Sequence, residues 1–280
     1  MCNGKQWIVG AVVLAGLAAH AAGQSLARVD FASAAAASTV VAADPLDKPA
    51  LSTTEGLGDW WRGGWTHNAD VGFFGSEGNS ESFSGRAGLG MTRLASDMES
   101  RAGINYQYAT TNSQKSKSRG EAFIRNDYIY RDSKWGFWAQ GKLEYDEFQA
   151  WDWRASAYAG PSYTFIKNDR TLLRGRAGLG VSYEFGGQAK EGLKFEGLLG
   201  LDYEQKLSER AKIYASVEWI PSISDWADYR LNANAGYEIL VDPESKMTLK
   251  LGLADRYDIN PGDGRKKNDF EYFGMLSWAF

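Results

Sequence analysis

The sequence has little of what most catalytic and metal sites need. It contains one cysteine, Cys2, and two histidines, His20 and His67, in 280 residues. With no cysteine after position 2, the rest of the chain can form no disulfide, thiolate nucleophile or cysteine metal site. One histidine beyond the first twenty residues is too few for a histidine zinc site. No cofactor site is expected.

Long apolar runs are also scarce. The longest one after the N-terminal region covers 32–43 and is interrupted by Ser33, Ser38 and Thr39. A transmembrane helix needs about 20 consecutive apolar residues, so no helical anchor is predicted. The net charge of −4 is small and acidic, which argues against a nucleic-acid partner because such a partner requires a basic face.

The N-terminus predicts export. Lys5, an apolar run over 7–18 and the small residues around Ala21 are typical of a signal peptide, predicted at 1–21. Residues 22–58 are rich in Ala and Ser and predict a flexible periplasmic segment. A Trp-rich lead-in begins at 59, and its indoles suit either a membrane interface or the mouth of a barrel. An exported chain without a helical anchor is either a soluble periplasmic protein or a β-barrel.

Aromatic residues and glycine are abundant, with 11 Trp, 14 Tyr, 13 Phe and 32 Gly. Over 268–280 the side chains alternate, so that one face is almost wholly apolar and aromatic. This alternation predicts a strand, and its apolar face suits a barrel wall in contact with lipid. Tyr272, Leu276, Trp278 and Phe280 also resemble the C-terminal signal by which the barrel-assembly machinery recognises bacterial outer-membrane barrels.

The same period of two continues through the chain from Trp65. It predicts twelve strands, at 65–76, 80–94, 98–111, 118–131, 134–148, 151–166, 171–185, 193–206, 210–221, 226–240, 246–259 and 268–280. The predicted fold is therefore all-β, an antiparallel transmembrane barrel of the outer-membrane type over 59–280. Tight and longer connections alternate, with a brief exception at 149–150, and this predicts that both termini are periplasmic.

The two faces of the predicted strands differ in polarity. The outward parity is apolar and aromatic, and the barrel is therefore expected to contact outer-membrane lipid. The inward parity carries the charges, which are candidate lumen-lining residues. They are Arg86, Arg101, Arg125, Asp127, Lys142, Glu144, Arg154, Arg174, Arg176, Glu196, Asp202, Glu218, Arg230 and Lys250. Bulky groups of the same parity, among them Phe74, Phe123, Trp138, Tyr158 and Tyr214, favour a partly obstructed lumen. A narrow channel and a closed structural barrel remain open alternatives.

Several short motifs occur together in one order. They are Gly-Ser-Glu-Gly-Asn-Ser-Glu-Ser at 75–82, Lys-Leu-Glu-Tyr-Asp-Glu-Phe at 142–148 before Trp-Arg at 153–154, Tyr-Asp-Ile-Asn-Pro at 257–261, and Asn-Asp at 268–269. In this order, with the terminal Phe280, they resemble the bacterial family of salt-induced outer-membrane proteins, whose domain carries an unknown-function label. The resemblance covers 65–280. It implies an outer-membrane barrel with an envelope-adaptive role and osmotic regulation, and it supplies no catalytic residues.

Two motifs suggest other functions. His67, with Asn68 and Asp70 nearby, could serve a lipid-modifying enzyme, but no serine is marked as its nucleophile, so an enzyme is not expected. The loop at 258–264 resembles a calcium loop, but the positions of its glycine and acidic residue are exchanged, and no metal site is predicted. A surface receptor or adhesin is a third hypothesis, which rests on the outer loops. The oligomeric state is not predicted.

Overall fold

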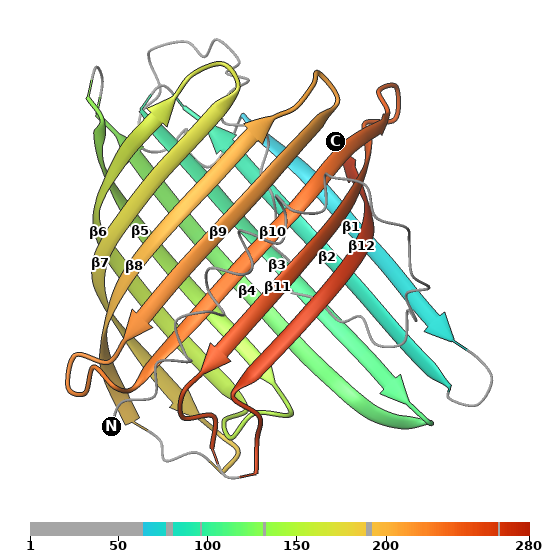
Figure 1. Ribbon diagram of the computed structural model, residues 1–280, viewed down its shortest axis with the longest axis vertical. Coiled ribbons are helices and arrows are strands. Elements are labelled where there is room, and N and C mark those ends of the chain that lie inside the picture. The colour runs from blue at the N-terminus through green and yellow to red at the C-terminus, as the bar shows by residue number, and fades with distance from the viewer. Residues whose placement is uncertain (1–63, 77–80, 96, 131–132, 189–191, 263) are drawn as a thin grey trace, which may run out of the picture. The chain divides into compact units, whose positions relative to one another are not determined.

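The computed structural model describes residues 64–76, 81–95, 97–130, 133–188, 192–262 and 264–280. These residues form twelve strands in a closed antiparallel barrel, in which every strand pairs with its neighbours in sequence and β12 pairs with β1 (Figure 1). The predicted fold class, an all-β antiparallel barrel of twelve strands, is confirmed. The predicted signal peptide, the flexible segment 22–58 and the tryptophans at 60 and 61 lie outside the described residues.

The strands match the predicted ranges closely. They are β1 (Trp65–Ser76), β2 (Ser82–Leu94), β3 (Met98–Thr111), β4 (Gln114–Ile129), β5 (Trp135–Asp146), β6 (Trp153–Lys167), β7 (Thr171–Phe185), β8 (Gly192–Lys206), β9 (Ala211–Pro221), β10 (Tyr229–Asp242), β11 (Met247–Asp258) and β12 (Asn268–Ala279). They form because alternating side chains give each strand one apolar and one polar face.

The connections differ between the two ends of the barrel. One end carries 95–97, 130–134, 168–170, 207–210 and 243–246, together with the first residue of β1 and the last of β12. We call it the short-turn end; it is at the top of Figure 1. The other carries 77–81, 112–113, 147–152, 186–191, 222–228 and 259–267, and we call it the long-loop end. None of its connections is shorter than the longest one at the short-turn end, with one exception at 112–113.

This exception corrects the predicted loop at 112–117. Residues 114–117 extend β4 and pair with β3 across a bulge at Ala109 and Thr110. Only Asn112 and Ser113 remain as a connection, with φ of 49° and 61°. Two residues at positive φ form a type I′ turn, whose twist matches that of the flanking strands. The predicted brief connection at 149–150 is also wrong, because six residues separate β5 from β6.

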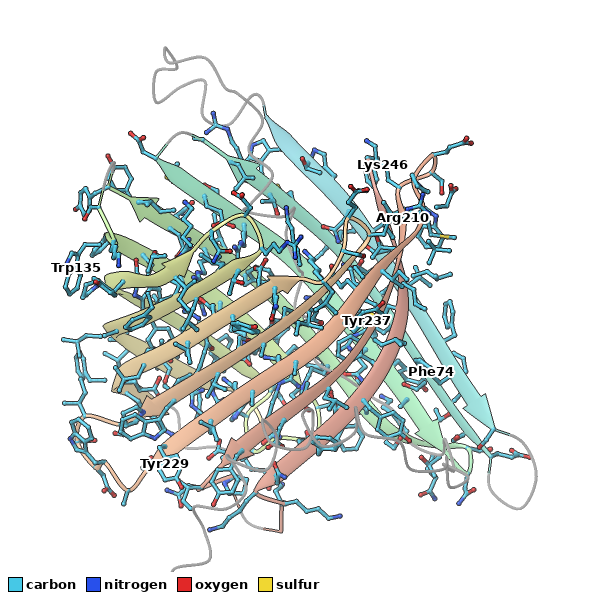
Figure 2. All side chains as sticks on the ribbon, turned by 45° about the horizontal axis from the view of Figure 1, so that its top comes forward. Phe74, Trp135, Arg210, Tyr229, Tyr237 and Lys246 are labelled. Atoms are coloured by element: carbon cyan, nitrogen blue, oxygen red, sulfur yellow. The ribbon has the colours of Figure 1, made fainter. Side chains whose placement is uncertain are left out.

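The outward face is apolar along every part of the wall. Phe73, Leu89, Ile104, Leu179 and Phe195 are all at least half exposed. Aromatic pairs collect near the strand ends, such as Trp135 with Tyr163 (ring centroids 4.9 Å apart). Figure 2 shows labelled aromatic side chains Trp135 and Tyr229 at strand ends, on different parts of the wall.

Candidate functional site

The inside of the barrel carries most of the charge. By strand register, all fourteen predicted lumen residues occupy inward positions. Eight of them are buried, namely Arg86, Arg125, Asp127, Arg154, Arg174, Arg176, Glu196 and Lys250. The other six, Arg101, Lys142, Glu144, Asp202, Glu218 and Arg230, are half-buried. Because isolated charges are costly to bury, the interior must pair them or bind counter-charges.

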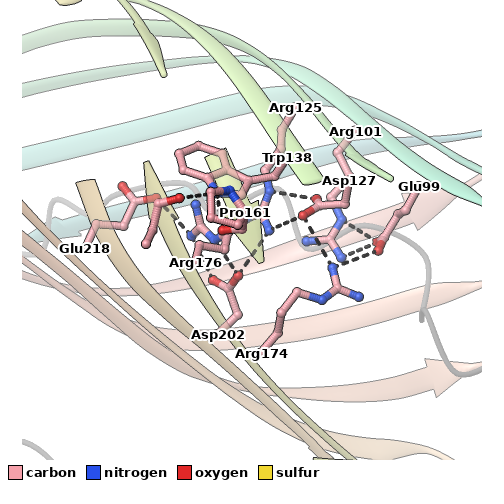
Figure 3. Close-up of polar contacts among 11 residues, drawn as sticks. Glu99, Arg101, Arg125, Asp127, Trp138, Pro161, Arg174, Arg176, Asp202 and Glu218 are labelled. Atoms are coloured by element: carbon pink, nitrogen blue, oxygen red, sulfur yellow. Dashed lines mark hydrogen bonds and ion pairs between the residues drawn. The ribbon is translucent and has the colours of Figure 1, made fainter. Parts of the chain in front are cut away.

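The largest group of pairs crosses the lumen (Figure 3). It consists of Glu99, Arg101, Arg125, Asp127, Arg174, Arg176, Asp202 and Glu218, which we call the lumen cluster. Arg125 on β4 reaches Asp202 on β8, with 3.1 Å between Nη2 and Oδ2. Three strands separate β4 from β8 along the wall, so this pair spans the inside of the barrel.

A second contact across the lumen runs parallel to the first. The Nη1 atom of Arg174 on β7 lies 3.4 Å from Asp127 on β4 and 3.6 Å from Glu99 on β3. Arg176 lies two residues further along β7 and holds Asp202 at 2.9 Å and Glu218 at 3.0 Å. The four guanidinium groups and four carboxylates of the lumen cluster balance in formal charge. Together they bring charged side chains from β3, β4, β7, β8 and β9 into contact inside the barrel.

Trp138 supports this cluster from the wall. It is fully buried, and its Nε1 donates to the carbonyls of Pro161 (3.1 Å) and Ala177 (3.2 Å). The guanidinium of Arg176 lies over its ring, 5.1 Å from the centroid. A side chain on Gly178 would come within 2.7 Å of the indole. The absence of a side chain at Gly178 therefore provides the space that the indole ring occupies.

Other inward aromatic rings lie against glycine in the same way. Tyr158 covers Gly180, and Tyr214 covers Gly236, each its direct partner on the next strand. An added Cβ would meet the ring at 2.3 Å and 2.4 Å, respectively. The expectation that these bulky groups obstruct the lumen therefore needs revision. The rings of Trp138, Tyr158 and Tyr214 cover wall glycines, and of these three the Tyr158 hydroxyl also reaches across to Glu196 on β8 and Arg230 on β10.

Further ion pairs lie toward the long-loop end. Glu196 accepts hydrogen bonds from Tyr158 (2.5 Å) and Arg230 (2.6 Å). Arg154 holds Glu184 at 2.5 Å and lies over the ring of Trp151, 4.2 Å from the centroid. These groups join β6, β7, β8 and β10 on the inner face.

The remaining predicted lumen residues are paired near their own strands, with one exception. Lys142 lies 2.9 Å from Glu121 and 3.1 Å from Glu144, and Lys250 lies 3.0 Å from Asp70. Arg86 differs, because its Nε and Nη1 have no hydrogen-bond partner among the described residues.

Sequence reasoning left out several inward carboxylates that complete these pairs. Glu99, Asp70, Glu121 and Asp146 share the inward parity of their strands, and Glu271 pairs with Lys117 from the far side of the lumen. Extending the period of two to the strand ends would have found them. Which partner each one meets across the lumen depends on the curvature of the barrel, which the sequence does not state.

Two cavities lie at different ends of the interior. At the short-turn end, a cavity of about 800 Å³ is lined by Thr66, Arg170, Arg210, Lys212 and Thr248, among others. Toward the long-loop end, a cavity of about 60 Å³ is lined by Lys142, Arg154, Tyr158, Arg230 and Asp269, among others. The larger of these two cavities therefore lies at the short-turn end.

His67 does not sit in a catalytic arrangement. It is exposed on the outward face and stacks on Phe280, with ring centroids 5.8 Å apart. Asn68 donates to Asp70 at 3.0 Å, and the Asp70 side chain is buried on the inward face. The carboxylate that a catalytic His67 would need as its orienting partner therefore lies on the opposite side of the wall.

Two kinds of feature are absent from the residues that the structure describes. No cluster of three or more His, Cys, Asp or Glu side chains there is arranged to hold a metal ion. Within the same residues, no helix has the length and apolar composition to cross a membrane.

The fold defines the class of protein: a closed twelve-stranded antiparallel barrel with an apolar outer wall and a charged interior. Residues 69–280 match the family described as "Protein of unknown function, DUF481", and the chain belongs to that family. None of the curated proteins matches the sequence.

Several solved barrels are similar in structure. The COG4313 outer membrane channel from Pseudomonas putida F1 is 10% identical, with a TM-score of 0.47, covering 85% of this chain and 100% of that one. The NanC porin is 12% identical, with a TM-score of 0.45 and coverage of 75% and 98%. The translocator domain of the autotransporter NalP from Neisseria meningitidis is 12% identical, with a TM-score of 0.42 and coverage of 80% and 91%. These values are too low to transfer any property of those proteins to this chain.

Proposed function

We propose that this protein is an outer-membrane barrel whose charged interior forms a narrow path for small solutes. The outward face supports the membrane setting, because Leu179, Phe195 and Phe73 are between 60% and 68% exposed. Such a face in water would be an aggregation hazard, whereas in a bilayer it contacts acyl chains. The short-turn end is periplasmic in this proposal, as the shorter inner turns of such barrels suggest.

The observation that carries the solute path is the lumen cluster. Its ion pairs reach from β4 to β8 inside the barrel, the rings of Trp138, Tyr158 and Tyr214 cover wall glycines, and a cavity of about 800 Å³ lies at the short-turn end. A ring of fixed charges in a narrow aqueous passage selects solutes by charge and size. A dry core of comparable volume would be filled more cheaply by apolar side chains.

Planar-bilayer recording of the refolded protein tests this proposal. We expect the wild type to give small conductance steps. The double variant R125Q/D202N removes the ion pair that spans the lumen and should give larger steps. K115Q is the matched control, because Lys115 is an exposed cation near the long-loop end, outside the lumen cluster, and this variant should conduct like the wild type.

The second candidate is a closed structural barrel, and the direct bridges between β4 and β8 and between β3 and β7 favour it. The two candidates differ in the same recording. A wild type that is silent at every voltage, with a double variant that is also silent, contradicts the solute path. A silent wild type with a conducting double variant would mean that the ion pairs close the lumen in the resting state.

The envelope-adaptive role and the assembly route complete the proposal. In this proposal the N-terminal segment directs export. The assembly machinery recognises the closing strand by its apolar outward residues Tyr272, Leu276, Trp278 and Phe280. An osmotic role predicts that cells lacking the protein grow more slowly at raised salt than at low salt. Equal growth at both would count against the salt-related role and leave the conductance test unaffected.

A further inference from the structure

A row of three polar residues interrupts the apolar outward face near the short-turn end. Arg93 on β2 is the register partner of Ser100 on β3, and Ser100 is the partner of Asn126 on β4. Arg93 is also the partner of Trp65 on β1, which shares the outward parity of Phe73. Residues directly opposite on antiparallel strands face the same side of the sheet, so all three polar residues point outward. We call Arg93, Ser100 and Asn126 the polar row.

The polar row is much less exposed than the rest of the outward face. Leu89 on β2 and Ile104 on β3 lie four residues from the row and are 53% and 55% exposed. Arg93 and Ser100 are only 4% and 1% exposed. Because nearby positions on the same strands and the same face are open, this burial requires a covering group on the outer side of the wall.

The polar row also limits the chemistry of that covering group. Ser100 Oγ and Asn126 Oδ1 are buried and have no hydrogen-bond partner among the described residues. A buried oxygen without a donor is costly, so buried polar groups are nearly always hydrogen-bonded. The covering group should therefore bring N–H donors to these two oxygens.

The chain approaches the polar row where it enters β1. Gly64, the residue before β1, has φ of 77°, a left-handed conformation that favours glycine. A Cβ on Gly64 would lie 3.5 Å from the Nε atom of Arg93. The chain therefore enters β1 beside the outward side chain of Arg93, and the preceding residues start at one end of the polar row.

From these observations we propose that the lead-in, Asp-Trp-Trp-Arg-Gly at 59–63, docks on the outer wall and covers the polar row with Trp60 and Trp61. Five extended residues reach roughly 16 Å, and the distance from β1 to β4 is three strand spacings, about 14 Å. The indole N–H is a donor only, and it usually finds an acceptor when it is buried. Trp60 and Trp61 therefore match the oxygens of Ser100 and Asn126.

The charges of the lead-in and of the wall also complement each other. The lead-in carries one acid, Asp59, and one base, Arg62. The wall at this level carries Arg93 and, in the adjoining connection at 95–97, Asp97. Opposite charges on the two surfaces favour one orientation of docking.

Docking on the wall has a consequence for the lumen. The cavity of about 800 Å³ at the short-turn end is lined by Lys206, Ser208 and Arg210, among others. A lead-in held on the outer wall directs the chain before Asp59 away from this cavity. The inference goes beyond the proposed solute path, and it does not require the lumen to conduct.

Photo-cross-linking of the full-length mature protein, refolded into phosphatidylcholine vesicles, tests the docking. p-Benzoylphenylalanine in place of Trp61 keeps an aromatic ring there, and peptide mass mapping after irradiation identifies what that ring contacts. We expect cross-links to the segments that contain the polar row, 91–102 and 124–128. The same group in place of Ala43 is the control and should give no cross-link to these segments.

The other cross-linking results would overturn the proposal. Cross-links to the turn at 207–210 would mean that the lead-in lies at the mouth of the lumen. Cross-links to lipid alone would mean that it lies in the membrane interface without a site on the wall. Equal cross-linking of the polar row from positions 61 and 43 would mean that the contact is not specific to the lead-in.

Two variants of the probe-bearing protein test the polar row itself. N126L removes the acceptor and should lower the cross-link yield about fivefold, as loss of one hydrogen bond from a docking equilibrium implies. I124A changes the neighbouring outward position on β4 and should leave the yield unchanged. Equal yields in the two variants would overturn the role of Asn126. Heat-modifiable gel mobility shows whether each variant folds, and the cross-links from position 61 alone test the docking if N126L does not.

Discussion

At the scale of single residues, the interior depends on matched charges. Lys250 and Asp70 form a pair whose side chains are 4% and 1% exposed, with 3.0 Å between Nζ and Oδ1. The pair links β11 to β1 across β12, and Asn68 adds a hydrogen bond to Asp70. Removing one member leaves the other charge buried without its counterion.

K250M should therefore destabilise the barrel by about 3–5 kcal/mol, the usual cost of breaking a buried pair from one side. The double variant D70N/K250M removes both charges and should lose much less. Urea unfolding in vesicles, followed by tryptophan fluorescence, measures both. Equal losses in the single and double variants would show that the pair contributes nothing through its charge.

Exposed ion pairs behave differently. Lys115 donates to both carboxylate oxygens of Glu147 at 2.9 Å, and both side chains are about 40% exposed. This hydrogen bond lowers the pKa of Glu147, which lies in the 147–152 connection outside the strands. Solvent screens such pairs, and for that reason K115Q serves as a control for changes inside the barrel.

At the scale of elements, most of the strands could be predicted from the sequence. The period of two placed β1, β3 and β7 at the observed bounds. It failed at β4, where the polar run at 114–117 suggested a loop. Gln114, Lys115 and Ser116 are exposed and Lys117 turns inward to Glu271, so polarity there does not distinguish strand from loop. The position of the turn depends on the positive φ of Asn112 and Ser113. These φ values belong to the backbone conformation, and the period of two does not predict them.

The type I′ turn gives a prediction about local stability. Ser113 has φ of 61°, a conformation that costs a residue with a Cβ about 1 kcal/mol or more and that glycine adopts readily. S113G should raise the free energy of unfolding by about 1 kcal/mol. S116G is the matched control, because Ser116 lies in β4, where glycine weakens a strand. A loss of stability in both variants would contradict the assignment of strain to Ser113.

The glycine–aromatic pairs give a second prediction at this scale. At Gly236 the three atoms nearest to an added Cβ all belong to the ring of Tyr214, at 2.4–2.6 Å. G236A should displace that ring into the lumen with the backbone retained, and it should reduce conductance. Adding Y214A removes the ring and should restore conductance at least to the wild-type value. Unchanged conductance in G236A would mean that the displaced Tyr214 ring packs elsewhere along the wall and does not enter the lumen.

The lumen site was only partly predictable. Parity identified which side chains share the interior, including Arg125, Arg174 and Asp202. It could not pair Arg125 with Asp202, because that contact depends on how far the sheet curls between β4 and β8.

At the scale of the whole molecule, the proposed bilayer makes the cost of a charge depend on depth. Leu179 lies in the middle of β7 and is 68% exposed on the outward face, whereas Leu193 lies at the end of β8. In a membrane, L179R should destabilise the barrel by about 2–4 kcal/mol and L193R by about 1 kcal/mol or less. Unfolding titrations in vesicles measure the difference. Equal costs at the two positions would argue against a bilayer around this wall.

The contacts that join early strands to late ones also have a consequence for how the chain folds. Lys117 and Glu271 are 154 residues apart, and Lys250 and Asp70 are 180 apart. Neither pair can form until the last strands have come round to the first ones. A sheet inserted flat would present all of these charges to hydrocarbon. In the proposed bilayer, we therefore expect curling to precede or accompany insertion, and we expect the meeting of the two ends of the chain to be the slow step.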